Sequence, residues 1–153
     1  MKLLVVSDSH GRDDKLEKII DTHSDADMLV FLGDGLRDAE EVFEKHCKIP
    51  CVMVKGNCDW SFDNRAPAEI ITKGGIKIVC CHGHTFGVKS GRGALAEYAA
   101  SIGASLALYG HTHTASEEHY DGVTVFNPGA VCEGSFGIVY IENGGILCSN
   151  GNI

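Results

Sequence analysis

The stretch Leu106-Ala107-Leu108-Tyr109-Gly110-His111-Thr112-His113 joins a short apolar run to two histidines separated by one residue. The apolar part predicts a buried strand, and the glycine after it lets the backbone bend or approach another segment closely. If the backbone stays extended, the two imidazoles project from the same side of the chain. Two imidazoles at the end of a buried strand are suited to binding a metal ion. Taken alone, the stretch is equally compatible with two surface histidines on a loop.

Three strands predicted in the first half of the chain end in a similar way. Residues 3–6 and 28–32 are continuous apolar runs, typical of strands covered on both faces, and residues 51–54 form a third run. Each run is followed by a loop that contains glycine and a polar side chain. Helically spaced apolar residues follow the first two loops. This βαβαβ order places a ligand site beyond the carboxyl ends of the strands.

The second half of the chain is mostly antiparallel in pattern. We expect strands at 68–72 and 75–81 joined by Lys73-Gly74, and a helix over residues 91–100. Two further hairpins are predicted around Asp121-Gly122 and around residues 143–145. Both halves fit an α/β (α+β) fold in which a two-layered sheet core is flanked by helices. We expect a single domain over residues 1–153.

Composition narrows the possible functions. The formal net charge of −8 excludes a large basic footprint for duplex nucleic acid, although bound metal ions would still admit a phosphate substrate. The seven cysteines include no CxxC pair, so we expect reduced thiols in a cytoplasmic protein. The apolar start is too short to span a membrane. A thiol-based redox protein is an alternative that rests on the cysteine count alone.

Polar side chains with nitrogen or oxygen donors follow the predicted strands. They are Asp8, His10, Asp34, Asn57, His82, His111 and His113. This mixed donor set suits Mn, Fe, Zn, Co or Ni and lacks the thiolates of a structural zinc site. Seven ligands exceed the needs of one tetrahedral ion but suit two ions about 3.5–4 Å apart that share a bridging carboxylate. Each residue alone is commonly a cap or turn residue. Their joint occurrence at strand ends favours the dinuclear metal site.

Five short sequence blocks resemble the motifs of a known family. Asp8-Ser9-His10, Gly33-Asp34, Gly56-Asn57, His82-Gly83 and Gly110-His111-Thr112-His113 resemble, in order, the motifs of the calcineurin-like metallophosphoesterases. The Asn127-Pro128-Gly129 turn and the compact length resemble that family's small single-domain branch, which contains bacterial and archaeal phosphodiesterases and the retromer scaffold subunit of eukaryotes. The resemblance implies a β-sandwich flanked by helices. It also implies that Asp8, His10, Asp34 and His113 bind one ion and that Asp34, Asn57, His82 and His111 bind the other, with Asp34 as the bridge.

The chain departs from the family pattern at one position. The family usually continues Gly-Asn with a histidine that binds phosphate or protonates the leaving group, and here that position is Cys58. A thiol is a poor general acid, so His84 is an alternative proton donor, and a surface histidine is the competing interpretation. Beside the ligand Asn57, Asp59 is a candidate for orienting Asn57 or a histidine. Trp60 and Phe62 either line a substrate cleft or pack in the core.

These observations predict a metal-dependent phosphoesterase, in particular a phosphodiesterase. A hydroxide activated by the dinuclear centre would attack phosphorus in line. We expect two divalent transition-metal ions, manganese ahead of nickel, iron, zinc or cobalt. The partner would be a small phosphodiester, with no membrane and no large nucleic acid duplex. A binding scaffold with little or no turnover is the alternative. The natural substrate, the native metal and the oligomeric state stay open.

Overall fold

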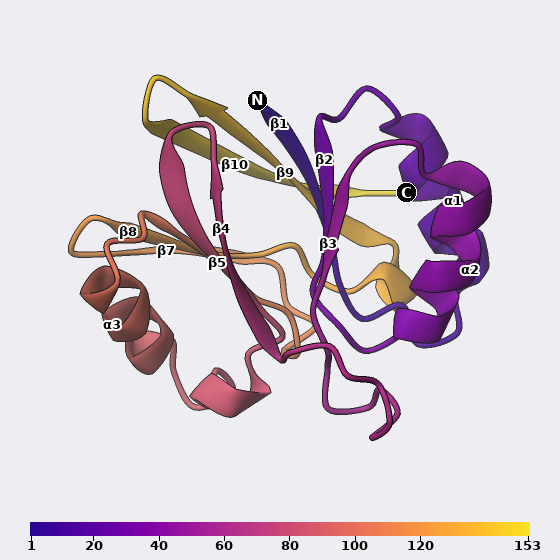
Figure 1. Cartoon of the computed structure of the whole chain (residues 1–153), viewed down its shortest axis with the longest axis horizontal. Helices are drawn as coiled ribbons and strands as arrows, with labels where there is room; N and C mark the ends of the chain where they lie inside the picture. Colours follow the sequence, from indigo (N-terminus) through magenta and orange to yellow (C-terminus); the bar gives the residue numbers. More distant parts are fainter.

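Two five-stranded sheets lie face to face in the computed structural model, which describes residues 1–153 (Figure 1). In spatial order, the first sheet contains β10 (Gly145–Asn152), β9 (Ser135–Glu142), β1 (Lys2–Val6), β2 (Met28–Phe31) and β3 (Cys51–Met53). The second sheet contains β4 (Ala68–Lys73), β5 (Ile76–Cys81), β6 (Leu106–Leu108), β8 (Val123–Asn127) and β7 (Ser116–Tyr120).

Parallel pairing runs through the middle of both sheets. Strand β1 pairs with β2 in the register Val5 to Val30, and β2 pairs with β3. In the second sheet, β6 pairs in parallel with both β5 and β8. The carboxyl ends of neighbouring parallel strands therefore lie at a shared edge of each sheet, as the sequence predicted for the first half.

Alternation along β1 explains why its sequence is a continuous apolar run. Leu3 and Val5 belong to the core between the two sheets, whereas Leu4 and Val6 face helix α1 (Asp13–Thr22) and the neighbouring α2 (Leu36–His46). All four side chains are fully buried. The prediction that this strand is covered on both faces is confirmed.

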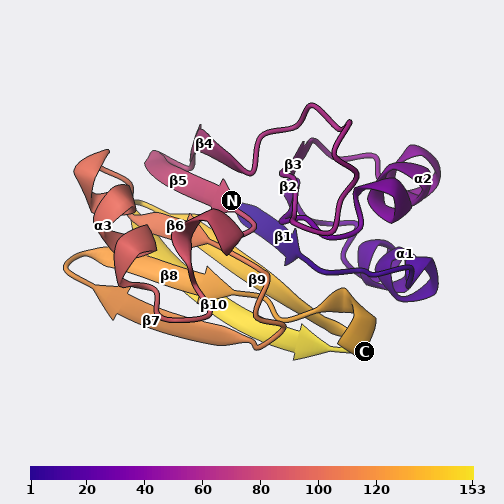
Figure 2. The same ribbon diagram turned by 90° about the horizontal axis from the view of Figure 1, so that it is seen from below.

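Helices complete the outer layers. Figures 1 and 2 show α1 and α2 together on one side of the molecule and α3 (Gly93–Ser101) on the opposite side. Leu95, Ala96 and Ala99 of α3 pack on Val79 and Val125 of the second sheet. None of these helices combines the length and the apolar character that crossing a bilayer requires. The predicted two-layered sheet core flanked by helices is confirmed.

The turns follow local sequence, with one shift. Asp121 and Gly122 both have positive φ, as expected for a two-residue hairpin turn. Between β4 and β5, the turn residues are Gly74 and Gly75, whereas the sequence predicted Lys73-Gly74. Lys73 instead pairs with Ile76, because a two-residue turn with positive φ at both positions takes two glycines without steric cost.

Candidate functional site

The site lies where loops from the two sheets meet. Loops after β1, β2 and β3 come from the first sheet, and loops after β5 and β6 come from the second. Together they bring all seven predicted ligands into two adjacent groups. One group contains Asp8, His10 and His113, and the other contains Asp34, His82 and His111, with Asn57 beside it.

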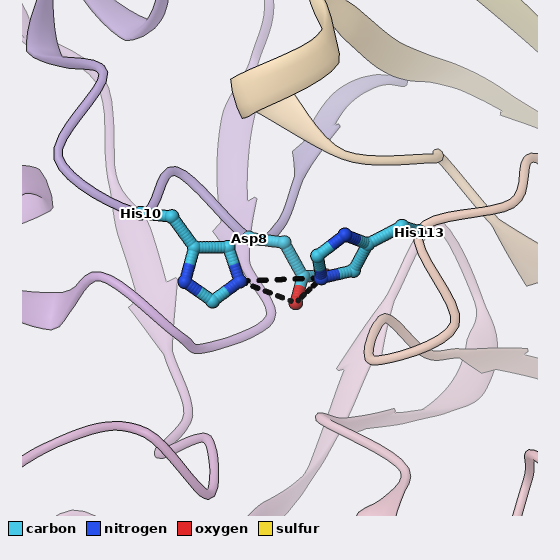
Figure 3. Close-up of side chains that lie close together, drawn as sticks. All are labelled: Asp8, His10 and His113. Atoms are coloured by element: carbon cyan, nitrogen blue, oxygen red, sulfur yellow. Dashed lines mark hydrogen bonds and ion pairs between the residues drawn. The ribbon is translucent and has the colours of Figure 1, made fainter.

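The first group points three donor atoms at one another (Figure 3). Nε2 of His10 lies 3.2 Å from Nε2 of His113. Oδ1 of Asp8 lies 3.2 Å from the same His113 nitrogen and 3.7 Å from the His10 nitrogen. Two imidazole nitrogens cannot both present lone pairs to each other at this distance without a proton or a cation between them. The arrangement therefore matches the requirements of a metal site.

The Asp8 carboxylate supports the same conclusion. Its Oδ2 accepts hydrogen bonds from Oγ of Ser7 at 2.6 Å and from the backbone N–H of His111 at 3.0 Å. Its Oδ1 has no hydrogen-bond partner, although the side chain is fully buried. A buried carboxylate oxygen without a partner is costly, and a cation held with His10 and His113 would satisfy it.

His82 organises the second group. Its Nδ1 donates to the backbone carbonyl of Leu32 at 2.7 Å, which fixes the ring orientation. Its Nε2 faces two oxygens, Oδ2 of Asp34 at 3.3 Å and Oδ1 of Asn57 at 3.1 Å. The His111 ring lies edge-on with its centroid 5.0 Å from that of His82. An imidazole nitrogen that faces two oxygens is stable only with a proton or a metal ion between them.

Asp34 connects the two groups. Its Oδ2 is 3.3 Å from Nε2 of His82 and 3.9 Å from Nε2 of His10, and its Oδ1 accepts the backbone N–H of Cys58 at 2.7 Å. Burial raises the pKa of the Asp34 carboxyl, but the hydrogen bonds from His82 and Cys58 outweigh burial and hold the pKa well below its usual value. Burial lowers the pKa of His82, and the hydrogen bond and charge of Asp34, with the charge of Asp8, reverse this and raise it.

The backbone at the candidate ligands is unusual. Asp8, His10, Asp34, His111 and His113 all have positive φ, between 45° and 68°. This corrects the expectation of an extended backbone at His111 and His113, since both lie in the left-handed region and their rings serve different groups. Residues other than glycine rarely adopt this backbone conformation without strain, and such strained residues cluster at functional sites.

Asp59 has a different environment from the one expected. It forms no hydrogen bond or ion pair with the Asn57 side chain or with a histidine. Its carboxylate instead accepts four backbone N–H groups, those of Asp34, Gly35, Leu36 and Gly56, at 2.8–2.9 Å. These bonds tie the loop after β2 to the loop after β3 and cap the start of α2. Asp59 therefore holds the backbone of Asp34.

The sequence did not predict the contacts that two supporting residues make with the site. Ser7 donates to Asp8, as described above, and the buried Asn127 donates to the carbonyl of Gly110 at 3.0 Å and to Oγ1 of Thr112 at 3.1 Å. The Asn127-Pro128-Gly129 segment is recognisable as a turn, and the Asn127 carboxamide does accept the Gly129 N–H at 2.8 Å. Its second contact, with the loop that carries His111 and His113, depends on tertiary structure.

The two candidate proton donors differ in their surroundings. The Cys58 residue is largely exposed, and the partial desolvation of its thiol together with the nearby Asp34 raises the pKa of that thiol. The His84 ring lies 5.4 Å from the His82 ring and 6.1 Å from the His111 ring, between centroids. Nδ1 of His84 is buried and has no hydrogen-bond partner. Of the two side chains, His84 is the one whose ring lies beside two candidate metal ligands, His82 and His111.

Comparison with known proteins agrees with this geometry. The family model described as calcineurin-like phosphoesterase superfamily domain matches residues 1–144. The chain is 33% identical over 133 residues to the probable metallophosphoesterase YsnB of Bacillus subtilis, covering 86% of this chain and 75% of that protein. It is 26% identical to vacuolar protein sorting-associated protein 29 of Saccharomyces cerevisiae, covering 89% of this chain and 56% of that protein.

A solved structure extends the comparison to the fold. The crystal structure of a conserved uncharacterized protein from Streptococcus pneumoniae, described as a predicted phosphoesterase, superimposes with a TM-score of 0.83 at 26% identity. The match covers 99% of this chain and 88% of the other. The two-sheet architecture and its flanking helices are therefore shared across nearly the whole chain.

Proposed function

Since the chain belongs to the calcineurin-like phosphoesterase superfamily, we propose that it is a metal-dependent phosphodiesterase acting on a small phosphodiester. The observation that carries the proposal is the fully buried Oδ1 of Asp8, which has no hydrogen-bond partner and faces the Nε2 atoms of His10 and His113. A hydrolase that binds divalent metal ions accounts for this donor set.

The donor atoms fit two ions that share Asp34. Asp8, His10, Asp34 and His113 would hold one ion, and Asp34, Asn57, His82 and His111 would hold the other. The nitrogen and oxygen donors suit manganese, with nickel, iron, zinc or cobalt as alternatives. When bound, such ions supply a nucleophile from water near neutral pH and neutralise charge that develops on the phosphoryl oxygens.

The protein's own residues position this chemistry. The bond from His82 to the Leu32 carbonyl leaves Nε2 of His82 directed at Asp34 and Asn57. The Cys58 N–H fixes one oxygen of Asp34, so the other oxygen is directed between His10 and His82. Because these contacts exist before substrate arrives, little reorganisation accompanies the reaction.

We assign protonation of the leaving group to His84. Its half-buried ring lies beside the rings of His82 and His111, with centroids 5.4 Å and 6.1 Å away, and a thiol such as that of Cys58 is a weak general acid. Replacing His84 with Gln should lower kcat by about a hundredfold for an alkyl leaving group and far less for p-nitrophenolate, which needs no proton. Cys58→Ser should change neither rate. Equal losses for both leaving groups in His84→Gln would refute the assignment.

The decisive test combines turnover with metal analysis. Wild-type protein should hydrolyse bis(p-nitrophenyl) phosphate with Mn²⁺ or Ni²⁺ and lose this activity in chelator. Asp34→Asn should lower both the metal content and the turnover. His46→Ala is the matched control and should leave both the metal content and the turnover unchanged. His46 lies outside the site, in a separate group of possible donors with the exposed Glu17 and Asp21. Unchanged metal content in Asp34→Asn would contradict the shared site.

A second candidate function is a protein-binding scaffold with little turnover. The specific observation in its favour is Cys58, which stands where the family usually has a histidine. The similarity to the yeast sorting protein is compatible with it. Metal-loaded protein that hydrolyses neither activated nor natural diesters with any of the five metals would favour this function over the enzyme.

A further inference from the structure

Two large aromatic side chains stand exposed beside the candidate site. Trp60 is 72% exposed and Phe62 is 87% exposed. Both lie on the segment between β3 and β4, which projects at the lower edge of Figure 1. Of the two alternatives left by the sequence, core packing is therefore wrong. Exposed aromatic rings near a polar site are characteristic of binding surfaces.

The aromatic rings share a pocket with the metal-binding groups. A pocket of about 590 Å³ is lined by Trp60, Phe62 and Leu36 and also by His10, Asp34 and Cys58. The pocket therefore combines candidate metal ligands with aromatic side chains. A ligand that fills it would direct its phosphate to metal ions held by groups that include His10 and Asp34, and another part to the rings of Trp60 and Phe62, the aromatic end of the pocket.

The segment that carries the rings is anchored. The backbone N–H of Lys55 donates to the Ala66 carbonyl, and Nζ of Lys55 donates to the Asp63 carbonyl, both at 2.9 Å. Arg65 bonds to Asp63 at 2.7 Å and reaches Glu40 of α2 at 2.6 Å. The Lys55 bonds close the segment on itself, and the Arg65–Glu40 bond ties it to α2, so the backbone that carries the rings is held beside the pocket.

Charge limits what the aromatic end accepts. Five carboxylates line the pocket, against one arginine, Arg37. Asp34 and Asp59 belong to the candidate metal site and its support. Asp38 accepts hydrogen bonds from Oγ of Ser9 and the N–H of Gly11, and Arg65 pairs with the other two acids, Glu40 and Asp63. The excess of negative charge disfavours a second phosphate at this end. An uncharged planar group is compatible with both the charge and the rings.

We propose that Trp60 and Phe62 form a subsite that stacks a planar aromatic group of the substrate, namely a nucleobase or an aryl ring attached to the phosphoester. The inference rests on the proposed function for the position of the phosphate. It narrows the substrate class from phosphodiesters in general to esters that carry an aromatic substituent. Stacking on exposed aromatic side chains is sequence-tolerant and strong enough to direct such a preference.

A matched ligand pair tests the subsite without turnover. Adenosine monophosphate carries a base where ribose phosphate has a hydroxyl group. Phenyl phosphate carries an aryl ring but no nucleobase, so it shows which of the two the subsite accepts. Calorimetry with Zn²⁺-loaded protein should show adenosine monophosphate or phenyl phosphate binding about tenfold more tightly than ribose phosphate. Because Trp60 is the only tryptophan, binding of the aromatic ligand should also change the protein's tryptophan fluorescence.

Substitutions test whether Trp60 and Phe62 cause the preference for aromatic ligands. Trp60→Ala combined with Phe62→Ala should reduce the affinity ratio to about one, whereas Trp60→Phe should keep most of it. Leu147→Ala, which removes an exposed apolar side chain on β10, is the control and should leave the ratio unchanged. Equal affinity of wild-type protein for both aromatic ligands and ribose phosphate would overturn the subsite.

Parallel hydrolysis of bis(p-nitrophenyl) phosphate separates this inference from the proposed function. Hydrolysis without any aromatic preference refutes the subsite and leaves the phosphodiesterase in place. Aromatic preference without hydrolysis under any metal refutes the phosphodiesterase and leaves an aromatic phosphate-binding site.

Discussion

Oδ1 of Asp8 lies 3.2 Å from Nε2 of His113. Asp8 follows β1 of the first sheet and His113 follows β6 of the second, so this contact exists only because the ends of the two sheets meet. The oxygen is buried and has no hydrogen-bond partner. The two sheets therefore hold a carboxylate and an imidazole in an arrangement that a cation would stabilise.

Gly110 makes the close approach of the two sheets possible. A Cβ atom at this position would lie 1.9 Å from Oγ of Ser7 and 2.8 Å from Oδ2 of Asp8. Gly110→Ala should therefore destabilise the protein by about 2 kcal/mol through overpacking and weaken metal uptake. Urea unfolding and metal analysis measure the two effects. Gly93→Ala in α3 is the control, because a Cβ there meets nothing within 4 Å. Comparable stability of both variants would contradict this account.

The left-handed backbone at His113 predicts an order of stability. In chelator, His113→Gly should be more stable than His113→Ala by about 1 kcal/mol, because glycine adopts φ near 59° without steric cost. The order should reverse at His119, an exposed residue within β7, where glycine weakens a strand. Denaturant melts of the four variants provide the comparison. Greater stability of His113→Ala would show that the backbone strain is absent.

The His82–Asp34 pair predicts a pH-dependent stability of the metal-free protein. The pKa of His82 is raised in the fold, so its contribution is fully present below about pH 6.5 and is lost as pH rises through the raised pKa. The depressed pKa of Asp34 acts only in acid, where its contribution is lost as pH falls. The free energy difference between wild type and His82→Asn should therefore shrink as pH rises above about 6.5.

The comparison with His82→Asn is necessary because other histidines oppose the trend. Burial and then the charge of His82 lower the pKa values of His84 and His111, so their contributions grow as pH rises through the ordinary imidazole range. Metal binding needs neutral imidazoles and should become tighter with pH. Urea unfolding in chelator isolates the His82 effect. A difference that is constant with pH would show that His82 is not charged in the metal-free fold.

The four backbone bonds to Asp59 predict a positioning role. Asp59→Ala should cost about 3 kcal/mol of stability and lower kcat, because the backbone of Asp34 loses an acceptor. The midpoints of the pH–rate profile should stay unchanged, since Asp59 would not exchange a proton with substrate. Asp25→Ala, at an exposed carboxylate paired with Lys2, is the control and should leave the stability nearly unchanged. A displaced pH profile in Asp59→Ala would instead support a catalytic carboxylate.

The sequence by itself determined most elements and the residue types available as candidate metal donors. Continuous apolar runs such as Leu3–Val6 specify strands buried on both faces, and Asp121-Gly122 specifies its hairpin, because these patterns act over a few residues. The donor residues could be recognised at the strand ends from local order alone. Their chemistry, nitrogen and oxygen without thiolate, follows from residue type.

Only the tertiary structure decided how these parts meet. The pairing of β1 with β9 joins Leu3 to Val139, and no local pattern encodes a contact over that separation. The positive φ at His111 and His113, the four bonds to Asp59 and the exposure of Trp60 all arise where loops from different strands are packed together. Such features depend on which backbone groups lie opposite each other after the sheets associate, and residue type alone does not specify that.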